Sequence, residues 1–190
     1  MLQWLIDIDK WIFFAINGYH TEWLDWVMWQ FSGGYFWLIA LFSIGFLLVK
    51  QFGRKGWFLI LIAGVLFAIS DQTSNAFKKY LKRERPTHNP EMIKDINIVT
   101  DYRGGAYGFY SGHASNSFLL CTFAYFLLRK RLKGTGWLFA FAVLTSYSRI
   151  YLGVHYPFDI LMGALVGMAM GMGGYLIIRQ TKLVPLVSSQ

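Results

Sequence analysis

The sequence predicts an all-α fold, a polytopic membrane bundle of five membrane-spanning helices preceded by an amphipathic N-terminal helix. Two observations predict it. Of the 190 residues, 55% are hydrophobic and only 15% are charged, which is too apolar for a soluble domain of this size. The apolar residues also gather in stretches of membrane length, which requires about 17–25 mostly apolar residues. With four prolines and no low-complexity tract to serve as a linker, we expect residues 1–190 to form a single integral-membrane domain.

The N-terminal segment differs from the spans that follow it. Residues 2–17 are apolar, but Asp7, Asp9 and Lys10 interrupt them, and tryptophans stand beside these charges. This pattern is typical of an amphipathic helix that lies in the membrane interface, with a sixth membrane crossing as the alternative. We therefore expect residues 1–33 to form an N-terminal interfacial region. The transmembrane core would then comprise residues 34–190.

Five apolar stretches predict the spans. They cover residues 34–49, 57–83, 112–128, 135–152 and 157–178. The second turns polar after Ser70 but is expected to continue as a helix to about Arg83. The last span carries Gly163, Gly167 and Gly171 at four-residue intervals. Because such small residues let helix backbones approach closely, we expect this stripe to pack inside the bundle.

The connections between the spans predict their orientation. Nine basic residues and no acidic residue follow the first, third and fifth spans. They are Lys50, Arg54, Lys55, Arg129, Lys130, Arg131, Lys133, Arg179 and Lys182. Since cytoplasmic loops carry an excess of Lys and Arg, these three segments are predicted to be cytoplasmic. The opposite, external face then receives the end of the second span, residues 86–111, and the turn between the fourth and fifth spans.

The first polar group on this external face lies at the end of the second span. Lys78 stands seven residues before Arg85, two turns along one helical face. Pro86 disfavours helix at Arg85, so we expect its guanidinium at a helix end or in the following loop. Asp71 shares the face of Lys78 and should turn toward the bundle and pair with a cation. Alternatively, the basic residues here form a juxtamembrane cluster that binds anionic headgroups.

The second polar group, Ser111-Gly112-His113, opens the third span. Gly112 can adopt backbone angles that expose N–H groups, and a helix start adds unpaired donors and partial positive charge. Together these features favour anion binding. The preceding residues 102–110 are rich in Gly and Tyr, as suits a loop that lies close over a ligand. The alternative is that Ser111 is only an N-cap and His113 only an interfacial histidine.

The third polar group surrounds the turn between the last two spans. Ser148-Arg149 ends the fourth span, and His155 and Asp159 follow, four residues apart. A carboxylate bonded to one imidazole nitrogen fixes the tautomer and leaves the other nitrogen as a nucleophile. A capping histidine with an incidental salt bridge is the alternative. On one membrane face the three groups would gather three cations, two imidazoles and a hydroxyl, a set suited to holding and attacking a phosphate.

These residues carry a family resemblance. Lys78-x6-Arg85-Pro86, Ser111-Gly112-His113 and Ser148-Arg149-x5-His155-x3-Asp159 resemble the three signature motifs of the type-2 phosphatidic acid phosphatase family, which also includes the vanadium haloperoxidases. The motif region covers less than half of the chain, and the flanking spans resemble the helical core of the family, many members of which show six spans. The second family motif usually begins with proline, where this chain has Tyr110, a difference in loop stiffness rather than in chemistry.

The resemblance implies a role for each site residue. His155 would attack phosphorus and form a phosphohistidine, with Asp159 orienting it and stabilising its charge. His113 would protonate the departing oxygen and then activate water. The phosphoryl oxygens would be bound by Lys78, Arg85, Ser111, Gly112 and Arg149. No metal and no cofactor is implied.

We therefore expect a metal-independent phosphatase that acts on a phosphate monoester or pyrophosphate of a membrane lipid, at the outer face of a bacterial plasma membrane. The candidate substrates are undecaprenyl pyrophosphate, phosphatidylglycerophosphate, phosphatidate and lipid A. Undecaprenyl pyrophosphate is the first choice, because short bacterial-looking members resembling this chain often serve that role.

Two other functional classes remain as alternatives. A non-catalytic phospholipid-binding or transport protein would use the same basic site, whereas a vanadate-dependent peroxidase is disfavoured because those relatives are generally soluble and larger. The net charge of +8 is divided among membrane-flanking loops, which favours membrane lipids as partners and argues against nucleic acid. The sequence indicates no particular oligomeric state.

Overall fold

The computed structural model describes residues 2–181, which form helices and connections. The α-helices are α1 (Leu2–Asn17), α2 (Glu22–Ser32), α3 (Gly34–Phe52), α4 (Arg54–Leu81), α5 (Gly112–Leu128), α6 (Leu138–Tyr151) and α7 (Pro157–Thr181). Short 3-10 helices lie at Pro86–His88, Val99–Asp101 and Thr135–Trp137. Within the described range, strand-like pairing is limited to an isolated bridge between Glu84 and Tyr107. The predicted all-α fold is therefore confirmed, while Lys182 of the charge argument lies outside the described residues.

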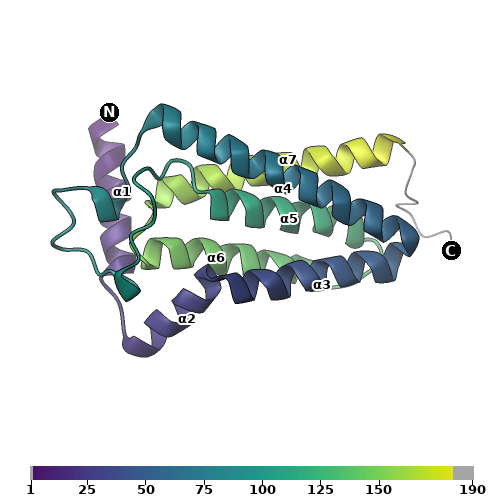
Figure 1. Cartoon of the computed structure of the whole chain (residues 1–190), viewed down its shortest axis with the longest axis horizontal. Coiled ribbons are helices and arrows are strands. Elements are labelled where there is room, and N and C mark those ends of the chain that lie inside the picture. Colours follow the sequence, from purple (N-terminus) through teal and green to yellow (C-terminus); the bar gives the residue numbers. More distant parts are fainter. Residues whose placement is uncertain (1, 182–190) are drawn as a thin grey trace.

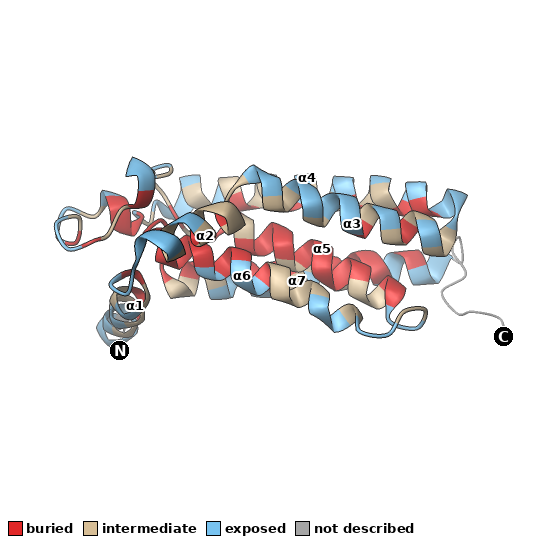
Figure 2. Ribbon diagram, turned by 90° about the horizontal axis from the view of Figure 1, so that it is seen from below, coloured by how far each residue is buried: buried red, intermediate tan, exposed pale blue. Residues whose placement is uncertain are grey.

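Helices α3 to α7 run side by side and form an elongated bundle (Figure 1). Helix α5 is the most enclosed of them, with 13 of its 17 residues buried, and it lies between its neighbours in Figure 2. Its sequence explains this position, because small and apolar residues surround the whole helix instead of forming one stripe. The start of α5 carries the second polar group, so that group lies in the middle of the bundle end.

The glycine stripe of α7 packs against α5, as predicted. A Cβ atom built on Gly163 would lie 2.5 Å from the carbonyl oxygen of Ser111, and one on Gly171 would lie 2.5 Å from that of Leu119. A Cβ on Gly167 would overlap the carbonyl oxygen of Ser115. The absence of side chains thus allows backbone-to-backbone packing, which holds the start of α7 against the start of α5.

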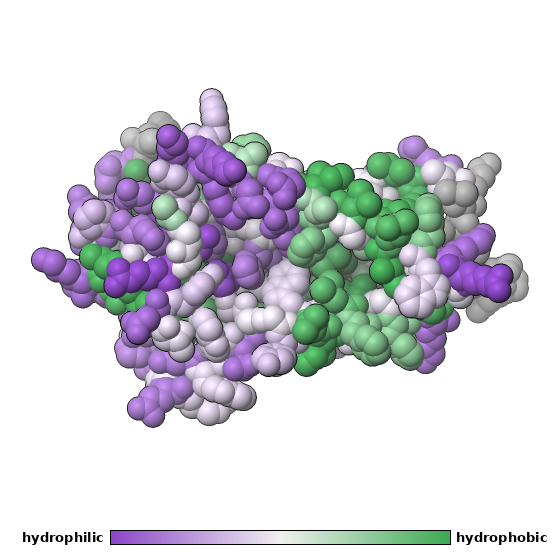
Figure 3. Space-filling model, in the orientation of Figure 1, coloured by the Kyte–Doolittle hydropathy of each residue, from purple (hydrophilic) through white to green (hydrophobic). Residues whose placement is uncertain are grey.

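Three helices of the described chain are long and apolar enough to cross a membrane. They are α3, α4 and α7. The other two predicted spans correspond to shorter helices, since α5 has 17 residues and α6 has 14. At a rise of about 1.5 Å per residue, α6 alone extends over roughly 21 Å. The count of five spans therefore stays a prediction, although Figure 3 shows an apolar surface between polar ends.

The N-terminal helix lies across the end of the bundle rather than along it (Figure 1). This orientation favours the predicted interfacial helix over the alternative of a sixth span. The helix α2 that follows was not predicted, although Thr21, whose hydroxyl accepts from the Leu24 N–H at 3.3 Å, and the acidic Glu22 are its start signals.

The predicted end of the second span requires a correction. Helix α4 ends at Leu81 instead of continuing to Arg83, because Lys82 adopts a left-handed conformation with φ 48°. The chain turns there, and Arg83 and Arg85 leave the helix axis. As expected from Pro86, Arg85 lies in the connection, where it precedes the 3-10 helix.

Candidate active site

The three polar groups predicted from the sequence meet at the end of the bundle that also carries α1 (Figure 1). A cavity of about 380 Å³ opens between them. Six of the predicted site residues line it, namely Lys78, Arg85, Gly112, His113, Arg149 and His155. They come from the end of α4, the following connection, the start of α5, the end of α6 and the α6–α7 turn. Ser111 and Asp159 lie behind the cavity wall and contact other residues of the group.

The side chains of His155 and Asp159 form a hydrogen-bonded pair. Asp159 Oδ2 lies 3.2 Å from His155 Nδ1 and also accepts the N–H of Tyr156 at 3.1 Å. Both side chains are buried, with exposed fractions of 1% for His155 and 0% for Asp159. Because the carboxylate accepts from a protonated Nδ1, the lone pair of the imidazole lies on Nε2. His155 lines the cavity, so an unprotonated imidazole nitrogen is available there for a nucleophilic role.

Burial and surrounding cations determine the protonation state of His155. Burial lowers its pKa well below the usual range, and the charges of Arg85 and Arg149 lower it further. The imidazole is therefore neutral at neutral pH, which is the form required of a nucleophile. Asp159 opposes these cations at close range and fixes the tautomer.

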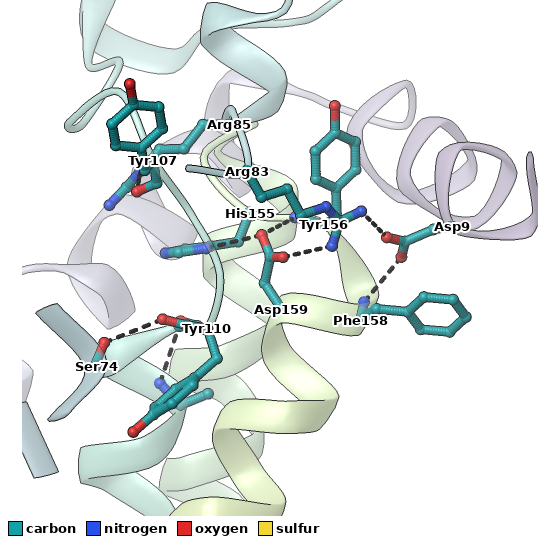
Figure 4. A network of polar contacts seen from close by, with 12 residues as sticks. Asp9, Ser74, Arg83, Arg85, Tyr107, Tyr110, His155, Tyr156, Phe158 and Asp159 are labelled. Carbon is teal, nitrogen blue, oxygen red and sulfur yellow. Dashed lines mark hydrogen bonds and ion pairs between the residues drawn. The ribbon is translucent and has the colours of Figure 1, made fainter. Parts of the chain in front are cut away.

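Two further charged side chains, Arg83 and Asp9, lie behind this pair (Figure 4). Arg83 donates from Nη1 to Asp159 Oδ1 at 2.6 Å and from Nη2 to Asp9 Oδ2 at 2.5 Å. Its guanidinium also lies over the ring of Tyr156, 4.3 Å from the ring centroid. Burial tends to lower the pKa of Arg83, but the Asp159 and Asp9 carboxylates outweigh burial and raise it. Arg83 is thus held charged between two carboxylates.

The cavity lining also includes cations with unused donors. Arg85 donates from Nε to the carbonyl oxygen of Tyr107 at 3.1 Å, whereas its buried Nη1 has no hydrogen-bond partner among residues 2–181. Burial, and then the charge of Arg149, lower the pKa of Arg85 to about 10. Arg149 donates to the hydroxyls of Ser32 and Tyr102, and its Nε is likewise unpartnered within the described chain. An anion in the cavity would satisfy these donors.

Residues 102–110 form a loop that lies close over the pair of His155 and Asp159, whereas its predicted position over a ligand stays a prediction. A Cβ atom on Gly108 would lie 2.8 Å from Asp159 Oδ2 and 3.4 Å from His155 Nδ1. Gly104 has a left-handed φ of +66°, and a Cβ there would overlap the guanidinium of Arg85. Glycine therefore allows the loop backbone to approach the charged side chains at both positions.

Tyr110, at the usual proline position, anchors the end of this loop. Its ring is buried against that of Phe77, with centroids 5.4 Å apart, and its carbonyl oxygen accepts from the Ser74 hydroxyl at 3.1 Å. The loop end is thereby attached to α4 by packing and a hydrogen bond.

The start of α5 places two of its three motif residues at the cavity. Gly112 and His113 line it, and the His113 ring packs edge-on against Trp37 with centroids 6.0 Å apart. The Ser111 hydroxyl instead accepts from the N–H of Ala114 at 3.4 Å and caps the helix. Its N–H donates to the carbonyl oxygen of Asp159 at 3.0 Å, which joins the starts of α5 and α7. The structure thus favours the N-cap interpretation of Ser111.

The comparisons with known proteins agree with this geometry. The family model of the PAP2 superfamily matches residues 55–182. The chain belongs to the PAP2 superfamily. The resemblance predicted from the three motifs is therefore confirmed, and with it the assignment of the chain to the lipid phosphatases, which are hydrolases.

Two curated relatives and a solved structure illustrate this membership. A lipid A 4'-phosphatase of Bacteroides thetaiotaomicron is 39% identical over 183 residues, covering 93% of this chain and 78% of the relative. A lipid A 4'-phosphatase of Porphyromonas gingivalis is 32% identical over 172 residues, covering 90% and 72%. The crystal structure of a transmembrane PAP2-type phosphatidylglycerolphosphate phosphatase from Bacillus subtilis matches with a TM-score of 0.74 and 24% identity. That match covers 94% of this chain and 88% of the other, and it shows a common fold. Superfamily membership, the curated relatives and the three helices long and apolar enough to cross a membrane make the protein an integral membrane protein.

Sequence reasoning missed some residues around the site. Arg83 was one member of a basic cluster, and Asp9 was one of the charges that interrupt the N-terminal segment. A signal for Asp9 exists in the sequence, since Asp9, Phe13 and Asn17 recur at four-residue intervals, and all three are buried in the structure. Asp71 faces the bundle as predicted, but it hydrogen-bonds the amides of Asn75 at 3.0 Å and Asn116 at 3.5 Å.

Proposed function

We propose that the protein hydrolyses a lipid phosphate through a phosphohistidine on His155. The observation that carries this proposal is the buried pair of His155 and Asp159 at a cavity that three cations also line. The cations are Lys78, Arg85 and Arg149. A neutral nucleophile in a cavity that several cations line favours attack on a bound phosphoryl group.

The reaction follows in two steps. His155 Nε2 attacks phosphorus, the bond from phosphorus to the lipid oxygen breaks, and His113 gives its proton to the departing oxygen. His113 then takes a proton from water, the resulting hydroxide attacks the phosphohistidine, and His155 is regenerated with release of phosphate. Arg85, Arg149, Lys78 and the Gly112 N–H bind the phosphoryl oxygens, whose charge increases in the transition state.

We further propose that the substrate is a phosphate monoester on a glycolipid of the lipid A type. The names of two relatives that this chain matches over most of its length support this choice over undecaprenyl pyrophosphate. The cavity lining supports it as well. Asn116 stands one helical turn after His113, and Asp71 lies beside it in the cavity wall. Because this wall lies next to the proposed acid, its carboxylate would repel a second phosphate of a pyrophosphate and accept hydrogen bonds from a sugar leaving group.

An apolar groove beside the cavity offers a place for the lipid chains. It has a volume of about 580 Å³, and its lining includes Phe36 and Ile39 of α3 together with Leu138 and Phe141 of α6. Phe141 contacts Trp37, which lines the polar cavity, with ring centroids 5.3 Å apart. The two spaces are therefore neighbours, which favours access to the site from the membrane.

The proposal is tested by phosphate release from a lipid panel with the purified full-length chain. We expect lipid A carrying a 4'-phosphate to be hydrolysed faster than undecaprenyl pyrophosphate, phosphatidylglycerophosphate or phosphatidate. Faster release from undecaprenyl pyrophosphate would contradict the proposed substrate but leave the proposed phosphatase activity in place. Binding of these lipids without release would establish the non-catalytic alternative instead.

We also propose that the site faces the periplasm or cell exterior, on the basis of the basic connections. Reporters inserted in the loop at residues 129–133 should be cytoplasmic, and reporters in residues 91–101 should be external. Both reporters on one side of the membrane would contradict this orientation.

A further inference from the structure

The N-terminal helix reaches the proposed catalytic pair through two charged side chains. Asp9 of α1 is fully buried, and its Oδ2 accepts from Arg83 Nη2 at 2.5 Å. Arg83 uses its other terminal nitrogen to donate to Asp159 Oδ1 at 2.6 Å, and Asp159 Oδ2 faces His155 (Figure 4). We refer to Asp9, Arg83, Asp159 and His155 as the charge chain.

Asp9 is also bound to the start of α7. Its Oδ1 accepts from the N–H of Phe158 at 2.8 Å. This N–H lies in the first helical turn, where backbone donors have no partner within the helix and the helix dipole favours a negative charge. Each oxygen of the Asp9 carboxylate therefore holds a group next to Asp159, one on the helix backbone and one on Arg83.

Helix α1 is itself fixed by contacts one and two turns after Asp9. Phe13 is fully buried, and its ring lies 5.8 Å from that of Tyr156, centroid to centroid. One turn further, Asn17 donates to the carbonyl oxygen of Tyr151 at 2.8 Å and accepts from the N–H of Asn97 at 2.9 Å. These contacts hold the Asp9 carboxylate in a defined position relative to α6, α7 and the connection over the site.

The charge of Asp9 has a separate consequence for His155. Arg83 alone would neutralise Asp159, and the pair would then give little support to the positive charge that develops on the imidazole. With Asp9 included, the three side chains Asp9, Arg83 and Asp159 carry a net charge of about −1. The other charged or titratable groups facing His155 are Arg85 of the connection, Lys78 of α4, Arg149 of α6 and His113 of α5. Asp9 thus opposes a predominantly positive surrounding.

We propose that Asp9 is a positioning residue of the phosphatase, which orients Asp159 through Arg83 and supplies negative charge to the charge chain. This inference rests on the proposed function of His155 and Asp159. Asp9 lies outside residues 55–182 that the family model matches. The N-terminal helix therefore completes a site whose motifs all lie elsewhere in the chain.

The substitution Asp9→Asn tests the proposal, with Asp7→Asn as the matched control. Asp7 lies on the same helix, but it is exposed and accepts a hydrogen bond from Gln3. In the full-length detergent-solubilised chain, we expect Asp9→Asn to lower kcat by about 10–100-fold, the scale for losing a partner that orients a site residue. KM should change little. The acid limb of the pH profile of kcat/KM should move to lower pH, because removal of one negative charge near His155 lowers the pKa of its imidazole. Asp7→Asn should match the wild type in kcat, KM and acid limb.

A second variant covers the case in which Asp9→Asn does not fold. Asp9→Glu keeps the charge but displaces the carboxylate, so kcat should fall while the acid limb stays in place. The proposal is overturned by a wild-type kcat in either variant, or by an Asp9→Asn protein that loses activity with an unshifted acid limb. A wild-type protein that releases no phosphate from any lipid of the panel would count against the proposed function instead.

Discussion

His155 and the three cations line the same cavity, yet their polar surroundings differ. On the His155 side, both oxygens of Asp159 and both oxygens of Asp9 accept hydrogen bonds. On the cation side, Arg85 Nη1 and Arg149 Nε are buried without a partner within residues 2–181. We call the His155 side, whose polar groups the protein itself satisfies, the closed wall, and the cation side, which keeps unpaired donors, the open wall. This difference suits the proposed function, in which the closed wall is fixed before a substrate arrives and the open wall binds the anion.

The largest expected effect comes from the closed wall. Replacing His155 removes the nucleophile, so His155→Ala should abolish turnover together with any trapped phosphoenzyme. Activity of the wild type should persist in metal chelators, because cationic side chains bind the phosphate. Steady-state phosphate release and acid-quench labelling measure both. Activity that survives in His155→Ala but disappears with chelator would point to a metal-activated water and would contradict the covalent mechanism.

His113 gives the next largest effect. It lies at the start of α5 rather than in the charge chain, so its loss leaves the nucleophile in place. We expect His113→Ala to slow turnover by about 10²–10⁴-fold, the usual scale for one general acid or base. A leaving group that needs no proton should reduce this loss. Comparison of a lipid phosphate with an aryl phosphate of low leaving-group pKa measures the difference, and an equal loss on both would assign His113 to binding.

The open wall predicts opposite effects on activity and stability. Arg85→Met should reduce kcat/KM by about 10²–10³-fold, the scale for one donor to a developing oxyanion. Its thermal midpoint without ligand should be unchanged or higher, because a buried cation with an unpaired Nη1 beside Arg149 is removed. Phosphate or orthovanadate should raise the midpoint of the wild type and not of Arg85→Met. A lower midpoint for Arg85→Met without ligand would show that this wall is also satisfied by the protein.

The sequence predicted one wall of the site better than the other. Lys78, Arg85 and Arg149 belong to sequence motifs in which a basic residue predicts phosphate binding. All three line the cavity. Arg83 and Asp9 could not be assigned in this way, because their ion pair joins positions 74 residues apart and depends on where α4 ends. The sequence predicted that α4 would continue to about Arg83, beyond its actual end, since nothing in the residue pattern indicated the left-handed Lys82.

The fold shows the same division between local and tertiary information. Apolar stretches predicted α3 and α7 to within a few residues at their ends, because burial in lipid depends on composition alone. Helix α2 was missed because its 11 residues are too few for a membrane span and its start signals, Thr21 and Glu22, are short-range. The orientation of α1 across the bundle end is fixed by the buried Asp9, Phe13 and Asn17, which contact segments far along the chain.

A pH experiment sharpens the comparison further. The pKa of His155 is lowered in the folded protein, by burial and then by Arg85, whereas an unfolded histidine has a pKa of about 6.5. Between these two values the unfolded state binds more protons, so stability is full above about pH 6.5 and falls as the pH decreases. The loss amounts to about 1.4 kcal/mol for each unit between the two pKa values. Unfolding measurements from pH 7 to pH 5 should show a steeper loss for the wild type than for His155→Ala; equal slopes would mean that His155 binds a proton as readily when folded as when unfolded.

The smallest effect is expected at Ser111, which the motif resemblance assigned to phosphate binding. In the structure its hydroxyl is buried as the N-cap of α5 and does not line the cavity. Ser111→Ala should therefore lower the free energy of unfolding by about 0.5–2 kcal/mol and leave kcat/KM close to that of the wild type. Ser111→Thr is the matched control, because threonine keeps a capping hydroxyl and should restore most of the stability. If Ser111→Ala instead lost about 10²–10³-fold in kcat/KM with unchanged stability, the hydroxyl would belong to the open wall, as the motif implies. The two measurements together decide whether this residue acts on the helix or on the phosphate.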